Sequence, residues 1–339
     1  MRALQITRHG GPEVLRVVEG PDPVPGPGQV KVRVRAAGLN FADIMARLGL
    51  YPDAPRPPCV MGYETAGVVE ALGEGAAGPP VGARVLALTR FGGQADAVCV
   101  PAAQVLEMPD GMGFEEAAAL PVNGITAWHA IFRVASVRPK ERVLVHMAAG
   151  GVGLCALQLL RTIAGVEVFG TASAGKHAAL RDFGCAHPID YRTQDYEAEV
   201  RRITMGRGVD VVLDPLGGRD TRRGYRLLRP GGRLVCYGAA NLATGERRSV
   251  VRSAVALAGT PFFTPLGLMS DNRAVAGINI GHLWGEAAML REELEALLGH
   301  WSHGELRARV DATFPLEQGA EAHRRIQSRQ NVGKVVLVP

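Results

Sequence analysis

The feature that most constrains this chain is an apolar strand pattern that runs directly into a glycine-rich turn and an apolar helix pattern. Residues 142–160 read RVLVHMAAGGVGLCALQLL. Glycines permit a tight turn and a close approach to a pyrophosphate, and the N-terminus of the next helix offers free N–H groups. The loop departs from a strict G-x-G-x-x-G, but Gly150 and Gly153 keep its last spacing. We predict that Gly150, Gly151, Val152 and Gly153 bind the phosphates of a dinucleotide; a purely structural turn is the alternative.

The rest of the chain divides into two patterns. The segment 30–35 (VKVRVR) alternates strictly, and 62–72 and 82–88 are further short strand candidates, which together predict a compact β-barrel. After about residue 114 strands and helices alternate, with strands expected at 142–148, 166–171, 188–191, 209–213 and 233–237. Such repeats predict an α/β fold with a doubly wound parallel sheet. A helix over 286–298 and a strand over 334–338 are expected near the end.

The end of the second parallel strand indicates which cofactor fits. An NAD-preferring site places an acid about 20 residues beyond the loop to bind the ribose 2′-hydroxyl. Here residues 170–176 read GTASAGK, without an acid. Ser173 and Lys176 can instead receive the 2′-phosphate of NADPH, which an acid would repel. A solvated lysine is the alternative for Lys176.

Charge and cysteine usage exclude several classes of protein. The net charge of +5 is scattered and aromatic residues make up only 5%, so we expect no nucleic-acid partner. The five cysteines include no C-x-x-C pair and no signal-peptide pattern begins the sequence, which favours a cytoplasmic protein. The uncharged segment 253–270 is interrupted by Gly259, Pro261, Pro265 and Gly267. We expect it to be buried or to line a pocket, rather than to contact a membrane.

Several motifs in the same order resemble the medium-chain dehydrogenase/reductase superfamily, specifically its zinc-independent quinone oxidoreductase branch. They are AAGLNFADIMARLGLYP (36–52), MGYETAGVVEALGEG (61–75), ALPVNGITAWHAI (119–131), VLVHMAAGGVG (143–153) and NVGKVVLV (331–338). Within that branch, HMAAGGVG, VFGTASAGKH, HPIDY and DPLGG are most similar to synaptic-vesicle amine-transport-type membrane protein homologues.

The resemblance implies a GroES-like catalytic domain over 1–122, a Rossmann NADPH-binding domain over 123–263 and a return to the catalytic domain over 264–339. It places Ser173, Lys176 and Tyr191 at the 2′-phosphate of NADPH. Asn40, Thr126 and Asn331 would contact the cofactor near the nicotinamide or the phosphates. A homodimer is also expected from the family.

Zinc-containing members of the superfamily supply a cysteine early in the first domain and a histidine in a G-H-E motif. The matching positions here are Asn40 and Gly62-Tyr63-Glu64, and neither asparagine nor tyrosine is a good zinc ligand. We therefore expect no metal. Without a Lewis acid, reduction of an activated acceptor is easier than oxidation of an alcohol.

The resemblance implies hydride transfer from NADPH to a quinone or to an α,β-unsaturated carbonyl, either an enone or an enoyl thioester. Tyr51 matches the proton-donating tyrosine of related enoyl reductases, and a phenol with a pKa of about 10 stays protonated at neutral pH. A packing role for Tyr51, or water as the donor, is the alternative; Asn40 would orient the substrate or the ribose. A lipid-binding or vesicle-associated protein using 253–270, or an NADPH-binding regulator, are the rival functions.

Overall fold

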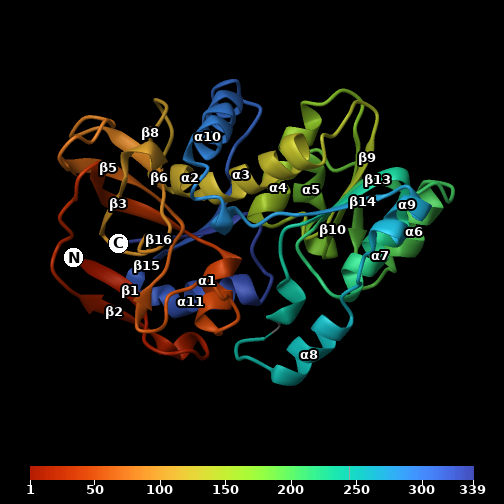
Figure 1. Cartoon of the computed structure of the whole chain (residues 1–339), viewed down its shortest axis with the longest axis horizontal. Helices are drawn as coiled ribbons and strands as arrows, with labels where there is room; N and C mark the ends of the chain where they lie inside the picture. Colours follow the sequence, from red (N-terminus) through yellow and green to blue (C-terminus); the bar gives the residue numbers. More distant parts are fainter. Residues whose placement is uncertain (244) are drawn as a thin grey trace. The chain divides into compact units, whose positions relative to one another are not determined.

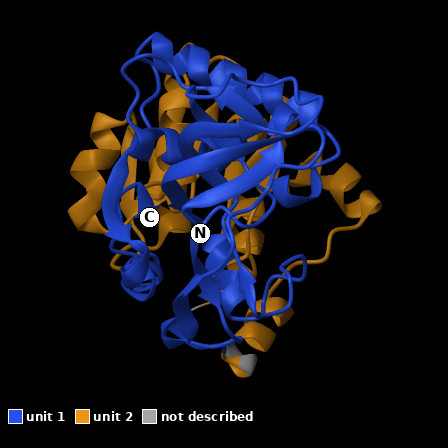
Figure 2. Ribbon diagram, turned by 90° about the vertical axis from the view of Figure 1, so that its left-hand side faces the viewer, with its two compact units in different colours: residues 1–125, 245–248, 280–339 blue, residues 126–244, 249–279 orange. Residues whose placement is uncertain are grey.

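The computed structural model describes residues 1–243 and 245–339. The chain forms two compact units, which Figure 2 colours blue and orange. Unit 1 comprises 1–125, 245–248 and 280–339, and unit 2 comprises 126–244 and 249–279. These boundaries follow contacts within each unit, and the domain division expected from the sequence remains a prediction.

Unit 1 is built on β-structure, as the alternating segments predict. A seven-stranded sheet has the order β15-β16-β3-β5-β6-β8, with β7 also paired to β3, and a smaller sheet has the order β2-β1-β4. Its strands are β1 (Arg2–Ile6), β2 (Leu15–Glu19), β3 (Gln29–Leu39), β4 (Cys59–Val60), β5 (Glu64–Leu72), β6 (Arg84–Leu88), β7 (Ala97–Pro101), β8 (Val105–Glu107), β15 (Val310–Pro315) and β16 (Lys334–Val338). Its helices are α1 (Phe41–Arg47), α2 (Phe114–Ala119), α10 (Ala287–Ser302) and α11 (Gly319–Gln327).

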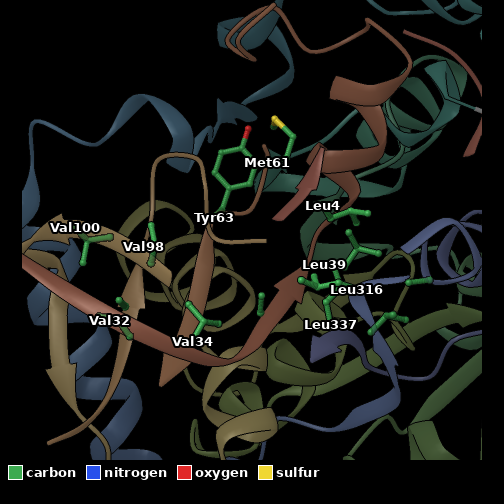
Figure 3. Packing of buried hydrophobic residues seen from close by; sticks show 14 of the residues in the cluster. Leu4, Val32, Val34, Leu39, Met61, Tyr63, Val98, Val100, Leu316 and Leu337 are labelled. Atoms are coloured by element: carbon green, nitrogen blue, oxygen red, sulfur yellow. The ribbon is translucent and has the colours of Figure 1, made fainter. Parts of the chain in front are cut away.

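Strand β3 shows how the pattern of apolar residues sets this core. Val30, Val32 and Val34 are buried, whereas Lys31 and Arg33 point away, because side chains alternate across a strand. The buried valines pack with Val98 of β7 and Leu337 of β16 in one hydrophobic cluster (Figure 3). The predicted alternation is thus confirmed.

Unit 2 contains a six-stranded parallel sheet with the order β11-β10-β9-β12-β13-β14. Its strands are β9 (Arg142–Val145), β10 (Glu167–Ala172), β11 (His187–Asp190), β12 (Val209–Asp214), β13 (Leu228–Cys236) and β14 (Ala274–Gly277). Its helices are α4 (Gly151–Arg161), α5 (His177–Asp182), α6 (Tyr196–Ile203), α7 (Arg219–Leu227), α8 (Val250–Ala258) and α9 (Pro265–Asp271), several of which are labelled around the strands in Figure 1.

Strands β9 and β12 are neighbours in the middle of this parallel sheet. From β9 the chain adds β10 and β11 toward one edge, and from β12 it adds β13 and β14 toward the other edge, so the strand order reverses between β9 and β12. In doubly wound sheets, ligands bind beyond the carboxyl ends of the strands at such a switch point. The glycine-rich loop comes between β9 and α4, so the topology puts the predicted phosphate loop at that place. The α/β fold class, with a GroES-like and a Rossmann-type part, is confirmed.

Helix α3 (Pro121–Trp128) continues the chain from unit 1 into unit 2. Pro121 is its first residue, where the missing N–H of proline has no intrahelical partner to lose.

The expectation that 253–270 is buried was wrong, and the alternative that it lines a pocket stays a prediction. Several of its large apolar side chains are exposed: Val255, Leu257, Phe262 (90% exposed), Leu266 and Met269. The glycines and prolines split the segment into α8 and α9, and neither short helix packs these side chains into the core of unit 2. The composition shows that the segment is apolar, but burial depends on whether another part of the folded chain packs against it.

Candidate functional site

The glycine-rich loop of unit 2 is shaped by close approach of the backbone. Gly150 is the residue before α4, and Gly151, Val152 and Gly153 form the first turn of that helix. A Cβ atom on Gly153 would lie 2.5 Å from the carbonyl oxygen of Ala148 and 2.6 Å from its Cα. No side chain fits there, so Gly153 is required for the strand-to-helix turn. The first N–H groups of α4 have no carbonyl partner within the helix and are available to an anion.

A threonine in the neighbouring strand holds this loop in place. Thr171 of β10 accepts a hydrogen bond from the N–H of Ala148 at its carbonyl (3.1 Å) and from the N–H of Met147 at its hydroxyl (3.3 Å). Nδ1 of His146 lies 3.1 Å from the same hydroxyl. Burial lowers the pKa of His146, so this imidazole is neutral near pH 7. Thr171 was not predicted from the sequence, where its one signal is a lone hydroxyl residue in an apolar strand.

The predicted 2′-phosphate residues lie after adjacent strands. Ser173 follows β10 directly, Lys176 ends the short 3₁₀ turn after it, and Tyr191 follows β11. Because Ala172 pairs with Asp190 in register, the structure brings Ser173 and Tyr191 to neighbouring strand ends. Tyr191 is also partly exposed, at 37%.

An acid does stand near these residues, although none occurs within 170–176. The Asp190 carboxylate accepts hydrogen bonds from the N–H of Arg192 (3.0 Å) and the hydroxyl of Thr193 (3.0 Å). The Arg192 N–H contributes most to lowering the pKa of Asp190, and the N–H of Ala174 also contributes. Asp190 therefore organises the two loops with its charge already compensated by local donors.

In unit 1, a buried polar cluster surrounds Asn40, the residue before α1. Asn40 Nδ2 donates to Glu64 Oε1 (2.8 Å), and Lys334 Nζ donates to Asn40 Oδ1 (2.7 Å). Lys334 also forms an ion pair with Glu64, in which both side chains are almost fully buried. Glu64 Oε2 accepts a further hydrogen bond from the N–H of Val122 (2.7 Å). A lysine ammonium thus neutralises Glu64, whose motif matches the G-H-E of zinc-containing relatives.

Lys334 was not predicted from the sequence. The signal was a single charged residue at the start of the otherwise apolar segment KVVLV. Asn40 was predicted, and its amide is oriented by Glu64 and Lys334. One N–H of this amide remains without a partner among the described residues, so it is available to a ligand.

Asp43 supports the same cluster from within α1. Its carboxylate accepts hydrogen bonds from the N–H groups of Asn40 (2.7 Å) and Gly62 (3.2 Å), and its side chain is fully buried. Burial raises the pKa of Asp43 to about 7. These contacts fix the turn that carries Asn40, which is a structural role.

A cavity of about 260 Å³ lies within unit 1, and Tyr51 is one of its lining residues. Its aromatic walls are Tyr51, Tyr63, Phe91 and Trp284. The Tyr51 and Tyr63 rings meet edge to face, with centroids 6.2 Å apart and an interplanar angle of 80°. Burial raises the pKa of Tyr63 well above its usual range, so its phenol stays protonated. The structure therefore brings Tyr51 into a concave, largely aromatic site.

The other predicted residues are distributed over both units. Asn331, in unit 1, donates from Nδ2 to the carbonyl of Gly333 (2.8 Å) just before β16. Thr126 is buried in α3, in the part of that helix that belongs to unit 2. Asn40 and Tyr51 also lie in unit 1. The glycine loop, Ser173, Lys176 and Tyr191 lie in unit 2.

Within residues 1–243 and 245–339, no group of three or more histidine, cysteine, aspartate or glutamate side chains is arranged to hold a metal ion. In the same part of the chain, no helix has both the length and the apolar character that a bilayer-spanning segment needs.

Comparison with known proteins gives concordant matches along the chain. Residues 26–110 match the family model described as "Alcohol dehydrogenase GroES-like domain", and residues 183–337 match the one described as "Zinc-binding dehydrogenase". The synaptic vesicle membrane protein VAT-1 homolog of Rattus norvegicus is 48% identical over 341 residues, covering 100% of this chain and 84% of that protein.

Two solved structures are also similar over the whole chain. Escherichia coli quinone oxidoreductase complexed with NADPH superposes with a TM-score of 0.87 at 28% identity, covering 100% of both chains. The CurK enoyl reductase superposes with a TM-score of 0.86 at 29% identity, covering 99% of this chain and 98% of that one.

Proposed function

The chain belongs to the medium-chain dehydrogenase/reductase superfamily as an oxidoreductase, and from that premise we propose a specific reaction. It transfers a hydride from NADPH to a quinone or to an α,β-unsaturated carbonyl, either an enone or an enoyl thioester, without zinc. The similarity to an NADPH-bound quinone oxidoreductase and to an enoyl reductase supports this reaction over a lipid-binding role.

The observation that carries the proposal is the set of donors in unit 2. The first N–H groups of α4 suit a pyrophosphate, while the Ser173 hydroxyl, the Lys176 ammonium and the Tyr191 phenol follow two adjacent strands. The acid next to them, Asp190, is hydrogen-bonded to its own loop. This set of donors fits a dinucleotide that carries a 2′-phosphate on its ribose better than a dinucleotide whose ribose 2′-hydroxyl is free.

Residues of both units are assigned to contacts with the cofactor. Gly150, Gly151, Val152 and Gly153 hold the pyrophosphate, and Ser173, Lys176 and Tyr191 hold the 2′-phosphate. Thr126 and Asn331 complete the cofactor contacts. When bound, NADPH supplies the hydride for the acceptor.

In unit 1, Asn40 and Tyr51 act on the substrate side. The remaining N–H of the Asn40 amide orients the substrate or the nicotinamide ribose, and Glu64 and Lys334 fix the direction of that amide. Tyr51 donates a proton to the α-carbon of a reduced enone from within the aromatic cavity. For a quinone acceptor, water is the second candidate donor.

The cofactor assignment is tested by titrating the purified protein with NADPH and NADH. We expect the wild type to bind NADPH more tightly than NADH. Lys176→Glu should weaken NADPH binding by at least about tenfold, because a hydrogen bond to a charged group contributes about 1.5–3 kcal/mol. Lys140→Glu is the matched control, since Lys140 precedes β9 whereas the loop follows it. Equal binding of both cofactors by the wild type, or equal losses in the two variants, would contradict the assignment.

The reaction is tested by following NADPH consumption with quinones, enones and enoyl-CoA esters. We expect turnover with at least one of these classes. Tyr51→Phe should lower kcat on an enone by about 10²-fold or more, in the range of general acid catalysis, and leave NADPH binding unchanged. Unchanged turnover in that variant would remove Tyr51 from the mechanism.

We also propose that the protein is a cytoplasmic homodimer. Strand β14 is an edge of the parallel sheet, and Phe262, Leu266 and Met269 present exposed apolar side chains elsewhere in unit 2. Light scattering over a concentration series should give twice the monomer mass. The monomer mass at micromolar concentrations would contradict the dimer.

A further inference from the structure

The aromatic cavity of unit 1 carries charged groups that the proposed reaction does not use. Arg90 lines it, and Asp53 and His282 lie at the same cavity. Hydride transfer and the Tyr51 proton need none of these three side chains. Their arrangement therefore bears on which substrate the cavity accepts.

The acid and the imidazole are paired with each other. His282 Nε2 lies 2.7 Å from Asp53 Oδ2. Arg90, in contrast, has neither a hydrogen-bond acceptor nor an ion-pair partner among residues 1–243 and 245–339. Asp53 is thus engaged with His282 rather than with Arg90, and the guanidinium is available to an anion from outside the chain.

Arg90 is exposed to solvent, and it shares the lining of the cavity with several aromatic side chains. Its neighbour Phe91 packs against Tyr63, with ring centroids 5.6 Å apart and an interplanar angle of 57°. Trp284 contributes another aromatic surface to the same cavity. Flat π-faces suit a planar conjugated molecule, and a guanidinium beside them suits a carboxylate through two parallel N–H donors.

The size of the cavity limits the ligand further. At about 260 Å³, it is slightly smaller than most small-molecule sites, which span about 300–1,000 Å³. The Asp53 carboxylate at the cavity disfavours a second negative charge on the ligand. A small planar molecule with one acidic group satisfies all of these features.

We propose that Arg90 binds the carboxylate of the substrate and thereby selects small, planar enones or quinones that bear one carboxylate. The inference rests on the proposed function, because it names the substrate class for that reaction. Arg90 acts here as a specificity residue and takes no part in the transfer of the hydride or the proton.

Binding is measured first, without turnover, using 3-benzoylpropionate and its uncharged amide as saturated probes. Quenching of tryptophan fluorescence reports occupancy, and loss of the signal in Trp284→Phe assigns it to the cavity. We expect the wild type to bind the acid more tightly than the amide. Arg90→Gln should weaken the binding of the acid about tenfold and change the affinity for the amide by less than about twofold. A loss of this size is expected for one partly exposed hydrogen bond between charged groups.

Arg56→Gln is the matched control, because Arg56 is an exposed arginine of the same unit that does not line the cavity. It should leave the binding of both probes unchanged. Turnover is then compared for 3-benzoylacrylate and its methyl ester with NADPH. The ratio of kcat/KM for acid over ester should fall about tenfold in Arg90→Gln and stay constant in Arg56→Gln.

The outcomes separate the two proposals. Selective, Arg90-dependent binding of the acid without any NADPH consumption supports the carboxylate site and contradicts the proposed reaction. Turnover in which Arg90→Gln affects acid and ester equally supports the reaction and overturns the role of Arg90. Equal binding of acid and amide by the wild type, or binding of neither, also overturns it.

Discussion

The ion pair between Lys334 and Glu64 gives the sharpest test of the buried cluster around Asn40. The exposed fractions of these side chains are 3% and 0%, so solvent screens the pair weakly. Replacing Lys334 by methionine keeps most of the side-chain volume and leaves the Glu64 charge buried. Removing one partner of a buried pair costs about 3–5 kcal/mol.

The structure places the expected cost for Lys334→Met near the lower end of that range. Glu64 keeps two donors, Asn40 Nδ2 at 2.8 Å and the N–H of Val122 at 2.7 Å. We therefore expect the free energy of unfolding to fall by about 3 kcal/mol at pH 7. The double variant Lys334→Met/Glu64→Gln should recover most of this loss, because its buried charge is gone while an amide oxygen still accepts.

The assay is equilibrium urea unfolding followed by tryptophan fluorescence. Trp284 and Trp301 lie in unit 1 and Trp128 lies in unit 2, so a Trp128→Phe background restricts the signal to unit 1. This restriction matters because proteins with two compact units need not unfold in one step.

Lys31→Met serves as the control within the same sheet. Lys31 pairs with Asp22 and Glu70, whose side chains are 42% and 39% exposed, so its loss should cost less than about 1 kcal/mol. The reasoning is refuted if Lys334→Met costs no more than Lys31→Met. It is also refuted if the double variant is less stable than the Lys334→Met single variant.

Three further predictions concern a proton, a turn and the metal. Burial raises the pKa of Asp43 to about 7 from an ordinary value of about 3.9, so the folded state binds the proton more tightly than the unfolded chain. The stability that this proton contributes is therefore lost as the pH rises toward and through 7. In urea unfolding, the free energy of unfolding of the wild type should fall between pH 5 and 8 by at least about 1.4 kcal/mol more than that of Asp43→Asn. Gly153→Ala should weaken NADPH binding at least about tenfold in a fluorescence titration, because the added Cβ would meet the Ala148 backbone. Gly175→Ala should leave NADPH binding unchanged, because a Cβ added there has nothing within 4 Å. Equal effects of the two substitutions would contradict the steric argument. Elemental analysis of the purified protein should find no stoichiometric zinc, and turnover should survive a chelator; loss of turnover that zinc restores would contradict a zinc-independent reaction.

What the sequence determined by itself follows from short-range chain geometry. The strand, glycine turn and helix at 142–160 occur as predicted, because glycine positions and apolar periodicity act within a few residues. The alternation in β3 was predictable for the same reason. The resemblance to a family of known fold extended these local predictions to the whole chain.

Tertiary structure alone decided how residues distant in sequence meet. Lys334 contacts Asn40 across 294 positions of sequence, and Trp284 joins Tyr51 and Tyr63 at one cavity. The same limit explains the error at 253–270, where several large apolar side chains are exposed in unit 2. Local patterns describe what a segment favours, whereas ion pairing and burial depend on which distant segment the folded chain places beside it.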